Sequence, residues 1–220
     1  MSTEKKLEEI EAITNQTSDL LNRILELSQD ADWEVRYQSI ECIQQSGVLD
    51  SLKRVRQGLY DSKELVRVVC LEVLGEVQDE RSVKDIKSLL NDASPLVRGA
   101  AALSLGKIGI GESIDDLLSR LQVEDDDEVK IPIYAALYTL GQDDYLENLL
   151  EGLNNEYYRV RCASANLLTD IANEHNNVKI VEALSLAFQR EKTVAASSSI
   201  KNALAYINDQ NKVRPIANTQ

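Results

Sequence analysis

Apolar residues along the chain recur at the spacing of an α-helix, in segments of two alternating lengths. From Val66 to Val77 they stand three and four residues apart, which places them on one face of an amphipathic helix. A shorter segment with the same spacing follows each longer one, for example at 114–121. Glycines that suit a left-handed helix C-cap stand just beyond longer segments, at Gly47, Gly109 and Gly141. The pattern predicts a helix, a turn and a second, shorter helix.

This arrangement returns about every 31 residues. Valine followed by a basic residue occurs at Val35-Arg36, Val66-Arg67, Val97-Arg98, Val129-Lys130 and Val160-Arg161. An acidic or amide residue stands five residues before each valine, at Asp30, Asp61, Asp92, Glu124 and Asn155, and a leucine stands twenty-four residues after it, at Leu59, Leu90, Leu121, Leu153 and Leu184. Intervals of 31, 31, 32 and 31 residues between the valines indicate stacked copies of one helical unit.

We therefore predict an all-α protein, an α-solenoid of about five helix pairs in a single domain over residues 1–209. The full repeats are expected at about 30–60, 61–91, 92–123, 124–154 and 155–189. An incomplete N-terminal repeat precedes them, with helices over 4–14 and 18–28, and a capping helix over 194–207 closes the C-terminal end. Residues 210–220 are expected to form a flexible tail.

The segment "DASPLVRGAAALSLGKIG", Asp92 to Gly109, resembles the HEAT repeat, particularly the short type of phycobilisome lyase-like proteins. The resemblance covers about 30–189. It implies stacked antiparallel helix pairs with the second helices on the concave side. It also implies that the aspartate and arginine of each Asp-to-Val-Arg segment tie neighbouring repeats together, so that Asp30/Arg36, Asp61/Arg67 and Asp92/Arg98 are structural. The tie is expected to weaken at Asn155, which lacks the charge.

Composition excludes most chemistry. The formal net charge of −13 disfavours nucleic acid, because phosphate binding depends on clustered Lys and Arg. Three cysteines without CxxC spacing and a single histidine, His175, indicate neither a disulfide framework nor a zinc or catalytic site. The acidic run at 124–128 fails as a calcium loop, because Val129, Lys130 and Ala136 stand where an oxygen ligand, a glycine and a bidentate glutamate are required. We expect no catalytic residue, no cofactor and no metal.

No apolar run approaches the roughly 18 residues that a membrane span needs, so the expected location is the cytoplasm, with no membrane contact. The charge itself is uneven. Residues 111–156 hold thirteen acidic and two basic side chains, a local charge of −11. Concentrating like charge costs self-repulsion, which favours a functional acidic surface over charge kept for solubility alone. We therefore predict a partner-binding surface that includes Asp115, Asp116, Asp125, Asp126, Asp127, Asp143, Asp144, Glu147 and Glu151.

Two aromatic residues share one column of the repeat. Trp33 and Tyr158 each stand two residues before the repeat valine. Both are candidates for the partner-binding surface, because Trp and Tyr often anchor protein interfaces. An aromatic side chain packed across a repeat boundary explains them equally well, and both interpretations stay open. If the second helices line the concave face, their charges run from basic at Lys53, Arg54 and Arg56 to acidic at Asp115 and Glu147, forming a polarised groove.

These observations favour a non-enzymatic interaction module that binds a basic protein. The most concrete version is an immunity protein or antitoxin that neutralises a cationic toxin such as a nuclease, a class that small acidic HEAT-like proteins resemble. The alternatives are a subunit of a bilin-lyase-like enzyme and a general scaffold or adaptor. The acidic run lies where the step from repeat leucine to repeat valine is 8 residues instead of 7, so we expect an ordered acidic edge in that turn.

Overall fold

The computed structural model describes residues 2–11, 18–46 and 51–213, and these residues contain helices and turns but no strand. This confirms the predicted all-α solenoid class. The chain divides into two compact units, unit 1 at Met1–Arg120 and unit 2 at Leu121–Gln220. Each unit is described by itself below.

The described residues of unit 1 form eight α-helices, the last of which runs three residues beyond the boundary of the unit. They are α1 (Thr3–Glu11), α2 (Ser18–Leu27), α3 (Trp33–Ser46), α4 (Leu52–Gly58), α5 (Glu64–Glu76), α6 (Val83–Leu89), α7 (Pro95–Ile108) and α8 (Ile114–Val123). Short 3-10 turns precede α6 and α8, at Glu80–Ser82 and Gly111–Ser113. Unit 2 contains α9 (Asp127–Thr139), α10 (Tyr145–Gly152), α11 (Tyr158–Ile171), α12 (Asn177–Arg190) and α13 (Val194–Val213).

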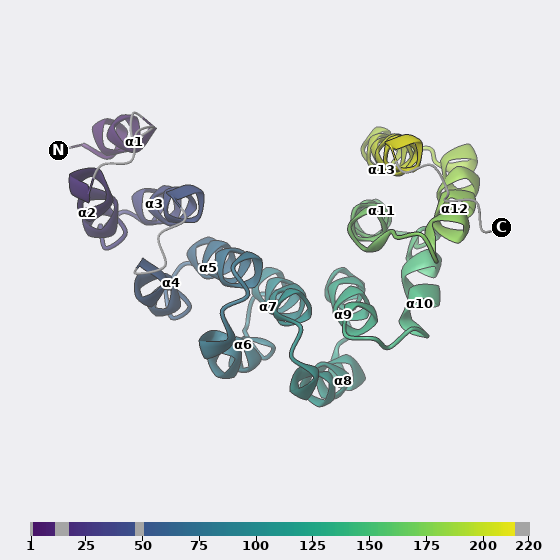
Figure 1. Ribbon diagram of the computed structural model, residues 1–220, viewed down its shortest axis with the longest axis horizontal. Helices are drawn as coiled ribbons and strands as arrows, with labels where there is room; N and C mark the ends of the chain where they lie inside the picture. The colour runs from purple at the N-terminus through teal and green to yellow at the C-terminus, as the bar shows by residue number, and fades with distance from the viewer. Residues whose placement is uncertain (1, 12–17, 47–50, 214–220) are drawn as a thin grey trace. The chain divides into compact units, whose positions relative to one another are not determined.

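The helices that carry the Val-Arg pairs form an inner row in each unit. In unit 1, α3, α5 and α7 pack side by side and α4 and α6 lie outside them. In unit 2, α9 and α11 form the row together with α13, which carries no such pair (Figure 1). The row is closely packed, because a Cβ on Gly75 of α5 would lie 3.0 Å from the backbone of Ser104 in α7. A helix covered on several sides must be apolar around most of its circumference. Accordingly α5 buries seven of its thirteen residues, whereas α6 buries two of seven.

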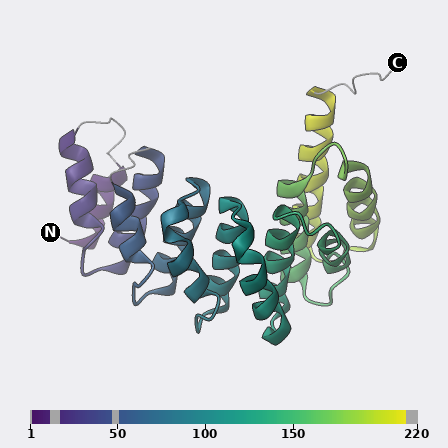
Figure 2. The same cartoon turned by 60° about the horizontal axis from the view of Figure 1, so that its bottom comes forward.

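The expectation that the shorter second helices lie on the concave side is therefore wrong. Each shorter helix also packs on the Val-Arg helix that follows it, α2 on α3, α4 on α5 and α6 on α7 (Figure 2). A helical repeat can be cut at either of its two turns without changing its period, so spacing alone does not identify the inner helix. The single-domain assignment over 1–209 stays a prediction.

The polarised groove expected along the second helices is not formed, because these shorter helices lie on the outer side. The basic side chains of α4 lie on an outer helix, and two of them are engaged within unit 1. Arg56 donates twice to the carboxylate of Asp79, at 2.6 Å each, and Arg54 Nε donates to Ser28 Oγ at 3.0 Å. These cations hold neighbouring layers together and do not line a groove.

The Asp-to-Val-Arg segments tie the layers together as expected. Arg36 makes two hydrogen bonds of 2.7 Å to the carboxylate of Asp61, one repeat further on, and Arg67 Nη2 donates to Asp92 Oδ1 at 2.8 Å. The same carboxylates accept backbone N–H groups two residues later, from Lys63 and from Ser94. We call this series of contacts the ladder.

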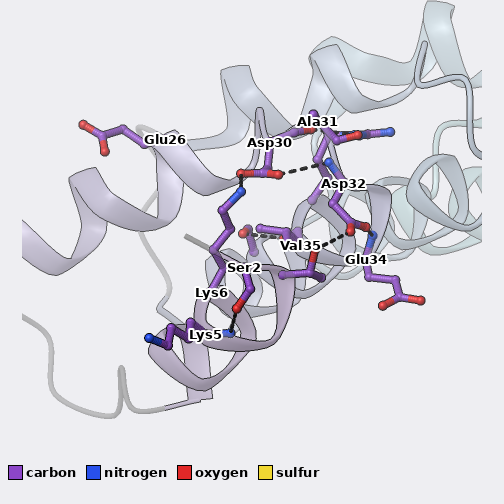
Figure 3. A network of polar contacts seen from close by, with 12 residues as sticks. Ser2, Lys5, Lys6, Glu26, Asp30, Ala31, Asp32, Glu34 and Val35 are labelled. Carbon is purple, nitrogen blue, oxygen red and sulfur yellow. Dashed lines mark hydrogen bonds and ion pairs between the residues drawn. The ribbon is translucent and has the colours of Figure 1, made fainter.

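Both ends of the ladder use other residues. At the N-terminal end Lys6 of α1 takes the place of the arginine and donates to Asp30 Oδ2 at 2.6 Å (Figure 3). At the C-terminal end Arg161 makes two hydrogen bonds to Glu191, which precedes α13; Nε donates to Oε2 at 2.6 Å. The side chain of Glu191 is 2% exposed, and its Oε1 also accepts the backbone N–H of Thr193. Helices α1 and α13 are thus held by the same device as the repeats.

The glycines predicted as C-caps take that role where the structure describes them. Gly109 and Gly141 have φ of 80° and 87°, a left-handed conformation in which a side chain would be strained. Gly47 lies outside the described residues. After α5, where no glycine occurs, Gln78 adopts a φ of 52° instead.

The ladder predicts a loss of stability in acid. The hydrogen bonds from Arg161, with the backbone N–H groups of Thr193 and Lys192, lower the pKa of Glu191 to about 2. Because the folded-state pKa lies below the unfolded one, the stabilisation is complete above about pH 5 and is lost as the pH falls towards 2. Glu191→Gln should therefore lower the free energy of unfolding at pH 7 by on the order of 3 kcal/mol and flatten its decline between pH 5 and 2.

Urea unfolding followed by circular dichroism at each pH measures this effect. Glu182→Gln, an exposed change on α12, is the control and should follow the wild-type curve. A pH profile of Glu191→Gln that superimposes on the wild-type profile would contradict the assignment.

Candidate protein-binding surface

The acidic run 124–128 forms an ordered turn between α8 and α9. This turn lies within a step of 8 residues from repeat leucine to repeat valine, one more than in the other repeats. Helix α8 continues to Val123, two residues past Leu121, whereas α6 ends one residue before the equivalent Leu90. The longer end of α8 therefore accommodates the additional residue. Glu124 is 5% exposed and its Oε1 accepts the backbone N–H of Asp126 at 3.1 Å. Asp126 in turn caps α9 by accepting the backbone N–H of Glu128 at 2.9 Å.

Asp127 has a structural role as well. Its Oδ1 accepts a hydrogen bond from Lys130 Nζ at 3.1 Å, and its Oδ2 accepts one from Asn155 Nδ2 at 2.8 Å. The bond from Asn155, followed by that from Lys130, holds the pKa of Asp127 below its usual range. Although Asn155 carries no charge, as the sequence shows, the layers are still joined here because Asp127 supplies the carboxylate.

The Asp127–Asn155 hydrogen bond brings two turns of unit 2 together. Glu156 and Tyr157 in the turn before α11 are exposed, as is Tyr158 at the start of that helix, with Tyr157 61% and Tyr158 43% accessible. Asp125 in the turn before α9 and Glu128 in the first turn of that helix are exposed too. We call these five residues, Asp125, Glu128, Glu156, Tyr157 and Tyr158, the acidic edge. Arg159 lies next to the acidic edge: a hydrogen bond with Tyr158 and the negative charge of Glu128 raise the pKa of its guanidinium.

The predicted acids of α10 lie on an outer helix. Asp144, Glu147 and Glu151 are three and four residues apart and therefore share one face of α10. Glu147 pairs with Lys179 of α12, whereas Asp143, Asp144 and Glu151 are exposed and form no ion pair with any residue in the described ranges. Asp144 and Glu151 are separated by about 10 Å along the helix. These acids thus form a stripe and not a compact site.

The remaining predicted acids belong to unit 1. Asp115 is exposed at the start of α8. Asp116 is paired with Lys87 of α6, with 2.8 Å between Oδ2 and Nζ. Asp116 therefore joins two outer helices of its own unit.

Trp33 and Tyr158 differ although they share a repeat column. Tyr158 is exposed, whereas Trp33 is partly buried and lines a cavity of about 360 Å³. The other lining residues come from three inner helices and are Leu7, Glu34, Tyr37, Gln38 and Leu65. Sequence reasoning missed this cavity, and it also missed Tyr157 and Glu156 as surface residues. The sequence signal for these two surface residues was that both are polar and stand just before the repeat valine and arginine.

Two HEAT-repeat family models match residues 52–138 and 20–45, together about half of the chain. The chain is a HEAT-repeat protein. The match at 20–45 spans α2 and α3, and the match at 52–138 begins with α4 and ends in α9. In the HEAT register the Val-Arg helix is therefore the second of each pair, the same grouping that the packing shows. The way the sequence was divided into repeats thus assigned the inner position to the wrong helix of each pair.

Among solved structures, the HEAT-repeat chain is similar to one from the CpcE–CpcF complex of phycocyanin lyase from Nostoc sp. PCC7120. That match has a TM-score of 0.65 and 14% identity, and it covers 94% of this chain and 95% of the other. Human deoxyhypusine hydroxylase matches with a TM-score of 0.43 and 16% identity over 94% of this chain and 98% of the other. A chain of the Kap95:Nup1 complex matches with 0.47 and 17% identity, covering 94% and 31%.

No curated protein sequence matches the chain significantly. At 14% identity the phycocyanin lyase likeness shows the fold alone. A protein-interaction scaffold fits the HEAT-repeat architecture. Across the described residues no group of His, Cys, Asp or Glu is arranged to hold a metal ion, and no helix there is long and apolar enough to cross a bilayer. All three cysteines are free thiols.

The site geometry separates structural acids from available ones. Asp127→Lys should lower the free energy of unfolding by about 1–2 kcal/mol, because it removes two hydrogen bonds and places a cation beside Lys130. Asp143→Lys and Glu151→Lys should each stay within about 0.5 kcal/mol of the wild type, since neither side chain has a partner to lose. Urea unfolding at pH 7 measures all three. Equal destabilisation by Asp127→Lys and Glu151→Lys would contradict this division.

Proposed function

We propose that the chain is a non-enzymatic interaction module whose acidic edge binds a basic protein. The observation that carries the proposal is the Asp127–Asn155 hydrogen bond, which places two exposed tyrosines beside an exposed acidic turn. Carboxylates steer a cationic partner during approach, and aromatic side chains supply contact area once it docks. The acidic edge combines both on one ordered stretch of unit 2.

Order in these turns supports recognition of a folded partner. Asp126 caps α9, Glu124 is buried, and Asn155 binds both Asp127 and the backbone N–H of Tyr157. Because these bonds already fix the backbone of both turns, little conformational entropy is lost on binding. The exposed acids of α10, Asp143, Asp144 and Glu151, and Asp115 of α8 extend the negative field around the chain.

The most concrete partner is a cationic toxin such as a nuclease, with the chain as its immunity protein or antitoxin in the cytoplasm. A nuclease must present a basic surface to bind phosphates. An acidic surface with aromatic anchors fits over such a surface and blocks the substrate. The phycocyanin lyase likeness is to a chain from a complex of two proteins, CpcE and CpcF, which accords with an interaction role.

Charge reversal at the acidic edge tests the proposal. The partner is first identified by cross-linking, co-purification and mass spectrometry from the native cells, and its association rate is then measured by stopped flow. Glu128→Lys/Glu156→Lys should slow association at least tenfold at 50 mM salt, with the difference shrinking at 500 mM salt because screening removes steering. The matched control, Glu80→Lys/Glu182→Lys, makes the same change in net charge at exposed positions elsewhere and should have a much smaller effect.

Two results would overturn the proposal. An acidic or neutral partner would contradict the charge argument, and an affinity insensitive to both salt and the edge reversal would indicate a general scaffold. Inhibition of a toxin's nuclease activity by the wild-type chain, weakened by the edge reversal, would support the immunity role.

A further inference from the structure

The cavity at Trp33 lies on the inner row of unit 1 and is independent of the acidic edge. Leu7 comes from α1, Trp33 and Tyr37 from α3, and Leu65 from α5. Three neighbouring inner helices thus contribute one or two apolar side chains each. At about 360 Å³ the cavity is at the lower end of ligand pockets, which span about 300–1,000 Å³. This size suits one or two side chains of a peptide.

The cavity remains accessible. Trp33 and Tyr37 are partly buried, and Leu65 at its rim is 40% exposed. These large apolar side chains line a concavity and remain in contact with water. The free energy of the system falls when a complementary apolar side chain covers them.

Unpaired carboxylates stand beside the cavity on the same helix faces. On α3, Glu34 and Gln38 line the cavity and Glu41 follows one turn later, where it accepts the Tyr37 hydroxyl at 3.0 Å. On α5, Glu72 lies two turns from Leu65. The side chain of Glu72 is exposed, but the atoms packed around its carboxylate and the negative charges of Glu41 and Glu76 together raise its pKa despite Lys107 nearby.

Three cations of α1, α3 and α7 are already engaged. Lys107 pairs with Glu76, Lys6 with Asp30 and Arg36 with Asp61. Neither Glu41 nor Glu72 forms an ion pair with a residue that the structure describes. A cation delivered from outside would relieve the repulsion between these two carboxylates. The cavity therefore presents apolar walls with a negative rim.

We propose that this cavity, which we call the Trp33 pocket, binds a basic peptide segment that inserts a bulky apolar side chain between Leu7, Trp33, Tyr37 and Leu65 and places a neighbouring arginine or lysine against Glu41 and Glu72. Charge complementarity determines the flanking residues, and the cavity determines the central one. The pocket is a second interaction surface, and its occupancy does not depend on the acidic edge.

Trp33 is the only tryptophan of the chain, so its fluorescence reports on the pocket directly. The probes are capped nonapeptides: one of alternating arginine and leucine, one with glutamate in place of every arginine, and one with serine in place of every leucine. We expect a saturable change in Trp33 emission with the arginine–leucine peptide, in the range of about 0.01–1 mM, and little change with the other two.

Variants of the pocket residues test whether the peptide binds at the Trp33 pocket. Glu41→Gln/Glu72→Gln should weaken binding of the arginine–leucine peptide at least fivefold at 50 mM salt, and Leu65→Ser should weaken it at least threefold. Glu80→Gln/Glu112→Gln, which removes the same charge from exposed positions, is the matched control and should change the dissociation constant less than twofold. Glu128→Lys/Glu156→Lys at the acidic edge should leave the Trp33 response intact, which separates this pocket from the proposed function.

Several results would overturn the proposal. They are an unchanged Trp33 emission with every peptide, an equal response to the glutamate peptide, and equal binding by Glu41→Gln/Glu72→Gln and its control. A change in Trp33 emission with protein concentration alone would also contradict it, since that result identifies the pocket as a contact between two copies of the chain.

Discussion

One repeated contact organises the structure: a carboxylate in the turn before a helix accepts the backbone N–H of that helix's N-cap residue and binds the arginine of the preceding layer. Asp61 and Asp92 each accept a backbone N–H at the start of a helix and the guanidinium of Arg36 or Arg67. The arginine in turn donates to a carbonyl oxygen of its own turn, as Arg36 does to Asp30. The two side chains thereby supply hydrogen bonds to backbone N–H and carbonyl groups in the turns between stacked layers. Without them, water would have to supply these hydrogen bonds.

The two proposed interaction surfaces lie where this contact departs from its pattern. At the fourth layer a lysine replaces the arginine and Asn155 replaces the acid, so Asp127 moves in to close the contact. The additional acids of that turn, Asp125 and Glu128, are then left on the surface beside Tyr157 and Tyr158. At the N-terminal end, α1 supplies Lys6 to the ladder and at the same time brings Leu7 over α3. Helix α1 thus contributes Leu7 to the wall of the Trp33 pocket.

The 31-residue period was sufficient to predict the helices and the stacked pairs, and the resemblance to the HEAT repeat implied the ties at Asp61 and Asp92. It was not sufficient to predict which helix of a pair lies inside, because the period is the same from either turn. Glu191 escaped prediction because α12 is longer than the other outer helices and moves the acid out of register. Trp33 and Tyr158 occupy one column but differ in burial, since exposure depends on the neighbouring helix and not on the repeat. The acidic stretch was visible in the sequence, while the division into buried, paired and exposed acids required the contacts.

The central claim is that the ladder pairs, and not the surface ion pairs, hold the layers together, and a double-mutant cycle on Arg36 and Asp61 tests it most directly. The side chains of this pair are 14% and 12% exposed, compared with 47% and 51% for the pair between Lys107 and Glu76. Urea unfolding of Arg36→Ala, Asp61→Ala and the double variant should give a coupling free energy of about 2 kcal/mol or more. The same cycle on Lys107 and Glu76 should give less than about 1 kcal/mol. Equal coupling in the two cycles would contradict the account.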